Sequence, residues 1–233
     1  MRFKVNFKDL SEHICVNFKE ATMVSDGGYE RGYAEGFNDG QFLWKYAKSL
    51  TNMFEYSEFP KGTQIVLNVP QLSVKTMNYV FRSATGVEYI KLKCIMRDTP
   101  MHWHSAFSRC YDLKVIDLTE FNTNFNASSD VFYGCLNLEE IRGEINNTTN
   151  NWTLWFTSCA KLREVRFKPN SIIGTFNIGN SPLLSQESIQ SIIDGLANLI
   201  GSASSTLIFN KDVKGKLTED QLGTITTKNW ILG

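Results

Sequence analysis

Apolar residues recur along the chain in one repeated phrase, Phe-x-x-Cys-x-x-Leu-x-x-(Ile/Val)-x-(apolar or Gly). Three copies begin at Phe107, Phe132 and Phe156, and a fourth begins at Phe81 with alanine at the cysteine position. The steps between the phenylalanines are 26, 25 and 24 residues. Self-similarity at a fixed period of about 20 to 50 residues is the sequence signature of a solenoid, in which each repeat stacks on its neighbours.

Each copy also predicts its own local structure. The Leu-x-x-Ile-x-Leu part alternates apolar with polar residues, which indicates a short strand, and the Phe-x-x-Cys spacing before it suits a helical or 3₁₀ turn. Upstream, Ile65 and Leu67 stand 25 residues before Ile90 and Leu92, which predicts one more strand. Stacked repeats would bury these apolar positions continuously, and no single repeat could hold itself.

The N-terminal residues follow two other patterns. Strict alternation in "FKVNFKDL", echoed by "ICVNFKEA", predicts a two-stranded hairpin over residues 1–22. The next stretch places Tyr29, Tyr33 and Phe37 at steps of four, beside glycines also four apart, which predicts a helix with an aromatic stripe. Because glycine weakens a helix, we expect this segment to order against a partner, either its own chain or a second copy. Residues 41–60 then read as a helix followed by a turn.

The period breaks after residue 178. Ser185 is a suitable N-cap for a helix whose isoleucines and leucines form one apolar stripe, and Thr218 is a suitable N-cap for a second helix. "STLIFN" and "NWIL" predict strands after each helix. We therefore expect a docking segment at 1–50, repeats at 51–178 and a capping unit at 179–233.

Composition excludes several classes of function. The 233 residues contain 24 Lys and Arg against 24 Asp and Glu, so the zero net charge provides no field for binding nucleic acid. We see no apolar run long enough to span a membrane and no signal peptide. The five cysteines form no CxxC pair, which argues against a disulfide framework and for synthesis in a reducing cytosol. No catalytic motif is present, so we expect no enzyme, no catalytic residue and no cofactor.

The repeated phrase resembles the leucine-rich repeats of the BspA-like type, found in bacterial surface proteins and in phage or prophage proteins of Firmicutes. The tail, "SPLLSQESIQSIIDGLANL" with "TLIF" and "LTEDQL…ITTKNWIL", is similar to the C-terminal cap of that group. The resemblance implies an α/β fold, a right-handed leucine-rich-repeat solenoid with irregular repeats of about 25 residues, an N-terminal β-hairpin and helix extension, and a C-terminal α/β cap. Gly143 departs from the pattern, because it replaces the last apolar position, and we expect an irregular sheet there.

A second resemblance concerns function. "VNF…VNF" followed by "YERGYAEGFNDG" is similar to the N-termini of predicted phage structural proteins. Together the resemblances imply a non-catalytic binding or structural protein, a phage or prophage virion component of the tail or host-attachment type, made in the bacterial cytoplasm. Its expected partners are a protein or surface glycan of a bacterial host, other virion proteins, and a further copy bound through the N-terminal segment. The alternatives are a bacterial cell-surface or secreted adhesin and an intracellular protein-binding scaffold.

The residues that could carry metal or redox chemistry have plainer interpretations. Cys110, Cys135 and Cys159 share one repeat position, and free cysteine behaves as a small buried hydrophobe, so we expect a packing column. His102 and His104 form an HxH pair, but two imidazoles do not complete a metal site. We therefore predict no metal.

Two sets of residues are candidate ligand contacts. The first is the outward face of the strands, where aligned repeats bring charged residues together; these are Tyr89, Lys91, Asp117, Glu140, Arg142 and Arg166. Opposite charges on neighbouring strands also stabilise a sheet, so this face is either a salt-bridged solvated surface or a protein-binding one. The second set is Trp103, Trp152 and Trp155, which lie near Asn-rich stretches. They suit stacking on sugars or anchoring a protein, or else packing between repeats.

Overall fold

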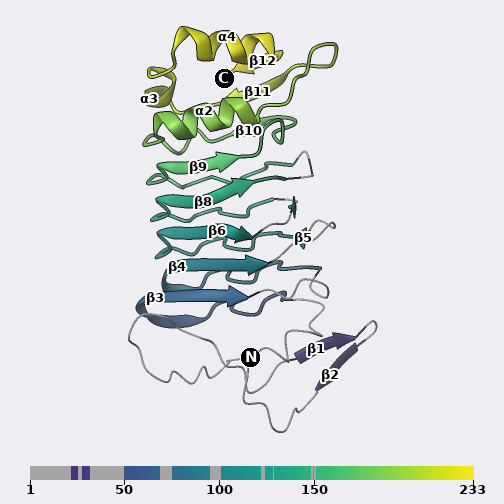
Figure 1. The fold of residues 1–233 in the computed structure, drawn as a ribbon. Helices are drawn as coiled ribbons and strands as arrows, with labels where there is room; N and C mark the ends of the chain where they lie inside the picture. The colour runs from purple at the N-terminus through teal and green to yellow at the C-terminus, as the bar shows by residue number, and fades with distance from the viewer. Residues whose placement is uncertain are drawn as a thin grey trace.

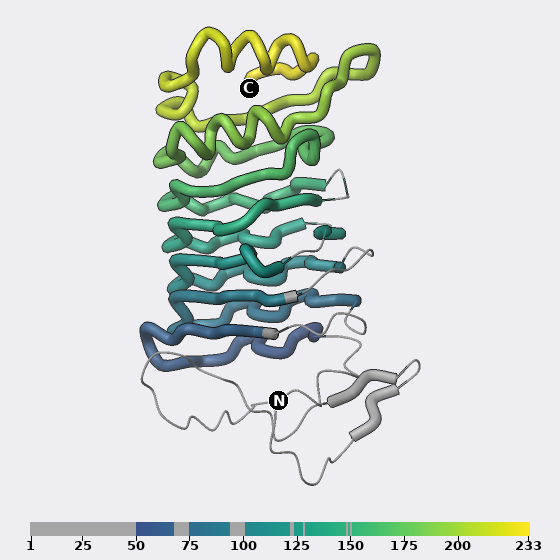
Figure 2. Tube along the Cα trace, in the orientation of Figure 1, coloured from purple at the N-terminus to yellow at the C-terminus, as the bar shows by residue number. Residues whose placement is uncertain are grey.

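The computed structural model describes most of the chain from residue 50 onward. The described residues are 22–25, 28–31, 50–68, 75–94, 101–121, 124–127, 129–147, 149 and 151–233. In Figure 2 the successive turns of the chain lie one above another, with the C-terminus at one end.

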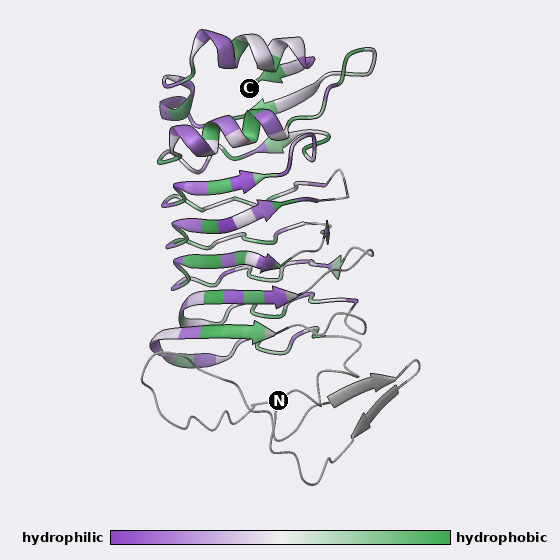
Figure 3. Ribbon diagram, viewed as in Figure 1, coloured by the Kyte–Doolittle hydropathy of each residue, from purple (hydrophilic) through white to green (hydrophobic). Residues whose placement is uncertain are grey.

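A parallel sheet of five strands runs through these turns in the order β3-β4-β6-β8-β9 (Figure 1). The strands are β3 (Glu58–Asn68), β4 (Thr85–Cys94), β6 (Val115–Phe121), β8 (Glu140–Ile145) and β9 (Glu164–Phe167). Each strand pairs with the strand of the next repeat, so the order in the sheet follows the order in the sequence. Hydrophobic and hydrophilic positions alternate along β4, β8 and β9 (Figure 3), which places one row of their side chains in the core.

The strand register confirms the alignment expected from the sequence. Ile65 pairs with Ile90 and Leu67 with Leu92. The irregularity expected at Gly143 is also confirmed. The β8–β9 register shifts between Glu140 and Glu144, and Gly143 has a φ of 88°. The shift brings Ile145, fully buried, into the apolar position that Gly143 leaves empty.

The segments before the strands form a second ladder, which we call the turn face. It consists of residues 51–56, 78–83, 104–109, 130–134 and 153–158. Backbone N–H groups of one turn donate to carbonyls of the next, for example Phe81 N to Ala106 O (2.8 Å) and Phe107 N to Val131 O (2.9 Å). Each turn carries two residues of positive φ, four apart, as at Ser105 (49°) and Arg109 (60°).

A column of stacked phenylalanines fills the space between the strands and the turn face. Consecutive rings from Phe54 to Phe156 have centroids 4.8 to 5.8 Å apart and interplanar angles of 7° to 22°. The members are Phe54, Phe81, Phe107, Phe132 and Phe156. Phe54 therefore begins one more repeat. The sequence did not reveal it because register shifts in β3 delay its strand.

The C-terminal unit contains three helices and a small parallel sheet. The helices are α2 (Gln186–Gly195), α3 (Lys211–Lys214) and α4 (Glu219–Thr227), and the strands are β10 (Phe176–Asn177), β11 (Ser205–Ile208) and β12 (Trp230–Leu232), in the order β10-β11-β12. The predicted N-caps are confirmed. The Ser185 side chain accepts from Ser188 N, and Thr218 forms a capping box with Gln221.

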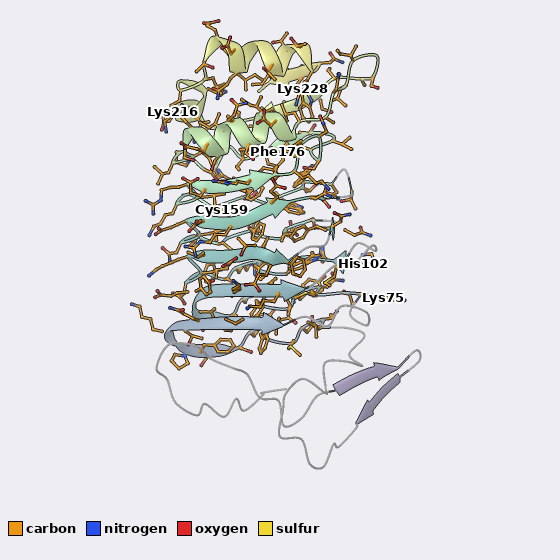
Figure 4. All side chains as sticks on the ribbon, in the orientation of Figure 1. Lys75, His102, Cys159, Phe176, Lys216 and Lys228 are labelled. Atoms are coloured by element: carbon orange, nitrogen blue, oxygen red, sulfur yellow. The ribbon has the colours of Figure 1, made fainter. Side chains whose placement is uncertain are left out.

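Helix α2 covers the outer edge of the five-stranded sheet. Val165 N and Phe167 N of β9 donate to Ser188 Oγ (3.0 Å) and Ser191 Oγ (2.9 Å), so helix side chains satisfy groups that a further strand would otherwise pair with. At the other end of α2, Lys228 Nζ donates to the carbonyls of Ile193, Asp194 and Leu196 at 2.7 to 3.1 Å. Figure 4 shows Lys228 in this unit.

Two short pairs of strands complete the described elements. β5 (Met101–His102) pairs in parallel with β7 (Phe125–Asn126). β1 (Thr22–Ser25) pairs antiparallel with β2 (Gly28–Arg31). The predicted aromatic helix is wrong at residues 28–31, which form a strand, and the hairpin predicted over 1–22 lies almost wholly outside the described residues.

The predicted fold class, a right-handed leucine-rich-repeat solenoid, is wrong. The structure is mixed α/β, with a parallel sheet of five strands and few helices. Among the described residues between 50 and 185 no helix forms, because the positive-φ residues of each turn interrupt any helical run. For the same reason the helix and following turn predicted within 41–60 are wrong in their described part, where residues 51–56 are turns and β3 begins at Glu58.

Candidate functional site

The three aligned cysteines form a buried column. Each thiol donates to the carbonyl of a phenylalanine one repeat earlier: Cys110 to Phe81 (2.8 Å), Cys135 to Phe107 (3.0 Å), and Cys159 to that of Phe132 (3.2 Å). Burial raises the pKa of Cys110 and Cys159 to about 12, and it raises the pKa of Cys135 well above its ordinary value. These thiols stay protonated at neutral pH, which is unsuited to nucleophilic or metal-binding use. Figure 4 marks Cys159 in the stack.

The two histidines lie in different environments. His102 is exposed on β5, whereas His104 is half-buried, with Nδ1 3.1 Å from Ser129 Oγ and its ring edge-on to Tyr79. No group of three or more metal-ligating side chains occurs among the described residues.

The tryptophans are buried, so the prediction that they contact a ligand at the surface is wrong. Trp103 and Trp155 are 0% exposed and Trp152 is 3% exposed. Their rings pack against phenylalanines, as Trp103 does on Phe125 at 4.8 Å between centroids. A side chain enclosed in this way cannot stack on a sugar at the surface, so the structure supports the alternative of packing between repeats.

The outward face of the strands brings together most of the predicted charged residues. In the strand register, Lys91 of β4 lies opposite Asp117 of β6, and Asp117 lies opposite Arg142 of β8. Arg166 does not join this row. It lies opposite Glu144, because the irregularity at Gly143 shifts the register.

Charges on this face are largely paired within the sheet. Lys91 Nζ lies 2.5 Å from Glu120 and 3.6 Å from Asp117, and Arg142 lies 2.9 Å from Glu140. Tyr89 Oη donates to Asp117 Oδ2 at 2.8 Å. The geometry therefore favours a solvated, salt-bridged surface over a binding one.

Asp117 is the most enclosed charge on this face, with 5% exposure. Burial by itself raises the pKa of the Asp117 carboxyl. Hydrogen bonds from Thr119 and Tyr89, together with the Lys91 ammonium, outweigh burial and hold the pKa below its usual range. Burial and the Asp117 carboxylate raise the pKa of the Tyr89 phenol.

We expect Asp117→Asn to destabilise the protein at pH 7 by about 1 to 3 kcal/mol, since charge-assisted hydrogen bonds are lost. A lowered folded-state pKa gives stability that is present above the unfolded pKa of about 3.9 and is lost as pH falls through the folded value. The difference between wild type and variant in urea denaturation should therefore shrink below about pH 4. Glu140→Gln, at a half-exposed partner of Arg142, should change stability much less. A difference that stays constant down to pH 2 would contradict this account.

A shallow trough of about 290 Å³ crosses the turn face. It is lined by residues of five consecutive turns, which share positions next to the stacked phenylalanines. The lining residues are Tyr56, Arg82, Ser83, Ser105, Ser108, Arg109, Asp130, Tyr133 and Leu154. None of them was predicted, because they occupy variable positions of the repeated phrase. Aligning the residues on both sides of each phenylalanine would have brought Arg82, Ser108 and Tyr133 into one column.

The two arginines of the trough differ in their partners. Arg82 forms an ion pair with Glu55, with Nε 2.6 Å from Oε1, and its guanidinium lies over the Tyr79 ring at 4.3 Å. Arg109 forms no ion pair within the described part of the chain, and its guanidinium lies 5.9 Å from the centre of the Tyr133 ring. Arg109 is therefore an exposed cation available to a ligand.

The trough also contains an unsatisfied acceptor. Asp130 Oδ1 is buried and has no hydrogen-bond partner among the described residues. Ser105 and Ser108, each 5% exposed, lie at the base of the trough. The arrangement offers aromatic rings, hydroxyls, a carboxylate, and an arginine without an ion pair to any described residue.

The remaining predicted residues lie elsewhere. Tyr29 falls on β2, and Tyr33 and Phe37 lie outside the described residues. Among the helices that the structure describes, none has the length and apolar character needed to cross a membrane.

Comparisons with known proteins do not identify a relative. No family model, curated protein or solved structure matches the chain significantly.

Proposed function

We propose that the protein is a non-catalytic binding protein, a phage or prophage virion component of the tail or host-attachment type. In this proposal the turn-face trough contacts a protein or surface glycan of the bacterial host. The N-terminal segment, with Tyr29, Tyr33 and Phe37, attaches the chain to other virion proteins or to a second copy.

The trough is the observation that carries the proposal. It gathers an arginine that no described carboxylate pairs with, an exposed tyrosine and buried hydroxyls on one ladder of turns. Together with tryptophan, tyrosine and arginine are enriched among the residues that carry most of the binding energy at protein–protein interfaces. On the strand face, by comparison, charged side chains form ion pairs with one another within the sheet. The similarity of the N-terminal segment to phage structural proteins supports the virion setting.

The binding role predicts a loss of host attachment when the trough is altered. Labelled full-length protein should bind bacterial cells, and Arg109→Ala with Tyr133→Ala should weaken that binding about tenfold or more. Arg166→Ala, on the strand face, is the matched control and should bind like wild type. Wild-type binding by the trough variant would remove the trough from the function.

The virion role has a separate test. Mass spectrometry of purified virions from a producing culture should detect the chain, and its absence from them would leave a cell-surface adhesin or a scaffold. In the same setting, replacing Tyr29, Tyr33 and Phe37 with serine should lower the amount incorporated, whereas unchanged incorporation would contradict the assembly role.

A further inference from the structure

The shape of the trough matches an extended ligand. It runs from Tyr56 on the first turn to Leu154 on the fifth. Stacked strands lie about 4.8 Å apart, so the backbones of the five lining turns span roughly 19 Å. A volume of about 290 Å³ spread over that length is shallow. This shape suits a short chain of units lying along the stack better than a compact cofactor.

The base of the trough contains a hydrogen-bond acceptor without a donor among the described residues. An ionised carboxylate only accepts hydrogen bonds, and Asp130 Oδ1 is buried with no donor from the described residues. A buried acceptor in that state is unfavourable. A ligand hydroxyl that reached Oδ1 would supply the missing donor, and Ser105 and Ser108 line the same trough.

The rim of the trough carries an exposed arginine that suits an anionic ligand group. Arg109 is exposed and has no carboxylate partner within the described residues, whereas Arg82 is neutralised by Glu55. A guanidinium presents paired N–H donors that match the two oxygens of a carboxylate or phosphate. Because Arg109 already lies against the Tyr133 ring, part of its mobility is lost before a ligand binds.

Aromatic rings complete the surface. Tyr56 is 66% exposed at one end of the trough, and Tyr133 lies further along it beside Arg109. An aromatic face contributes apolar contact area at low conformational cost, and the phenolic hydroxyl adds a hydrogen-bonding group.

From these features we infer that the turn-face trough binds an acidic glycan, a chain of sugar or polyol units bearing carboxylate or phosphate groups. Unit hydroxyls donate to Asp130, the anionic group binds Arg109, and a ring face packs on tyrosine. The inference rests on the proposed function and names the chemistry of its ligand.

Calorimetric titration of the full-length protein tests this with three matched probes: a tetramer of galacturonic acid, its carboxyl-reduced form, and a tetramer of ribitol phosphate. At least one acidic probe should bind about tenfold or more tightly than the carboxyl-reduced one. Arg109→Gln should abolish that preference, and Asp130→Asn should weaken the binding of all probes. Asparagine tolerates the positive φ at this position, 59°, so the fold is retained, which thermal denaturation checks. Arg166→Gln is the control and should bind as wild type does.

The outcomes separate this inference from the proposed function. Equal binding of acidic and reduced probes, or an unchanged preference in Arg109→Gln, would overturn the acidic-glycan assignment. If no probe binds while cell attachment still depends on the trough, the assignment fails and the binding role stands. A preference for only one acidic probe supports the assignment and identifies the anionic group.

Discussion

Phe107→Ala should lower the free energy of unfolding by about 3 to 5 kcal/mol, the range found for deleting a buried aromatic ring. Phe107 is 0% exposed and lies between Phe81 and Phe132, with centroids 5.8 and 5.6 Å away. Truncation opens a cavity in the middle of the column, and neither neighbouring ring can move to fill it without leaving its own stack. Urea denaturation of the full chain, followed by circular dichroism, measures the loss.

Tyr111→Ala is the matched control for this prediction. Tyr111 is an aromatic residue of the same repeat but is 44% exposed, so its removal should cost less than about 1 kcal/mol. Equal losses for the two variants would mean that the phenylalanine column is not what holds the repeats together.

Gly86→Ala should lower the free energy of unfolding by a similar amount to Phe107→Ala, because of the backbone conformation at this glycine. Gly86 has a φ of 78°, and an added methyl group would overlap the Phe59 carbonyl, with 2.7 Å to its carbon and 2.9 Å to Pro60 O. Positive φ costs a non-glycine residue about 1 to 2 kcal/mol, and the clash must be relieved by moving β3 away from β4. We expect a total loss above about 3 kcal/mol, measured as the shift in denaturation midpoint.

Gly62→Ala separates strain from collision. Gly62 has nearly the same φ, 86°, but nothing lies within 4 Å of the added methyl group. Gly62→Ala should lower the free energy of unfolding only by the cost of backbone strain, about 1 to 2 kcal/mol. If Gly62→Ala and Gly86→Ala destabilise the protein equally, close approach of β3 to β4 contributes nothing.

The sequence was most informative where one physical requirement fixed both spacing and residue type. A buried row must be apolar in every repeat, so the pairing of Ile65 with Ile90 followed from alignment. Helix N-caps need a side-chain oxygen at one position, and Ser185 and Thr218 were read correctly for that reason.

Segments whose conformation depends on hydrogen bonds to neighbouring repeats could not be predicted from local sequence rules. The segment at 51–56 forms turns instead of a helix because its N–H groups donate to the next turn, as Phe54 N does to Val80 O. Residues such as Arg109 adopt positive φ, for which arginine has no preference of its own. The trough was not predicted because its residues occupy positions at which the repeated phrase allows any residue. The tryptophans were predicted as candidate ligand contacts because the residues that bury them belong to other repeats, which the local sequence does not show.

The hydrogen bonds between successive repeats have a mechanical consequence. They form two ladders, one in the sheet and one on the turn face, and both run along the stack. A pull along that direction stretches both ladders together, so detaching a repeat requires breaking the strand bonds and the turn bonds of one step at once. Bending, in contrast, would tension one ladder while compressing the other. The molecule should therefore act as a short stiff rod under load and fail one repeat at a time.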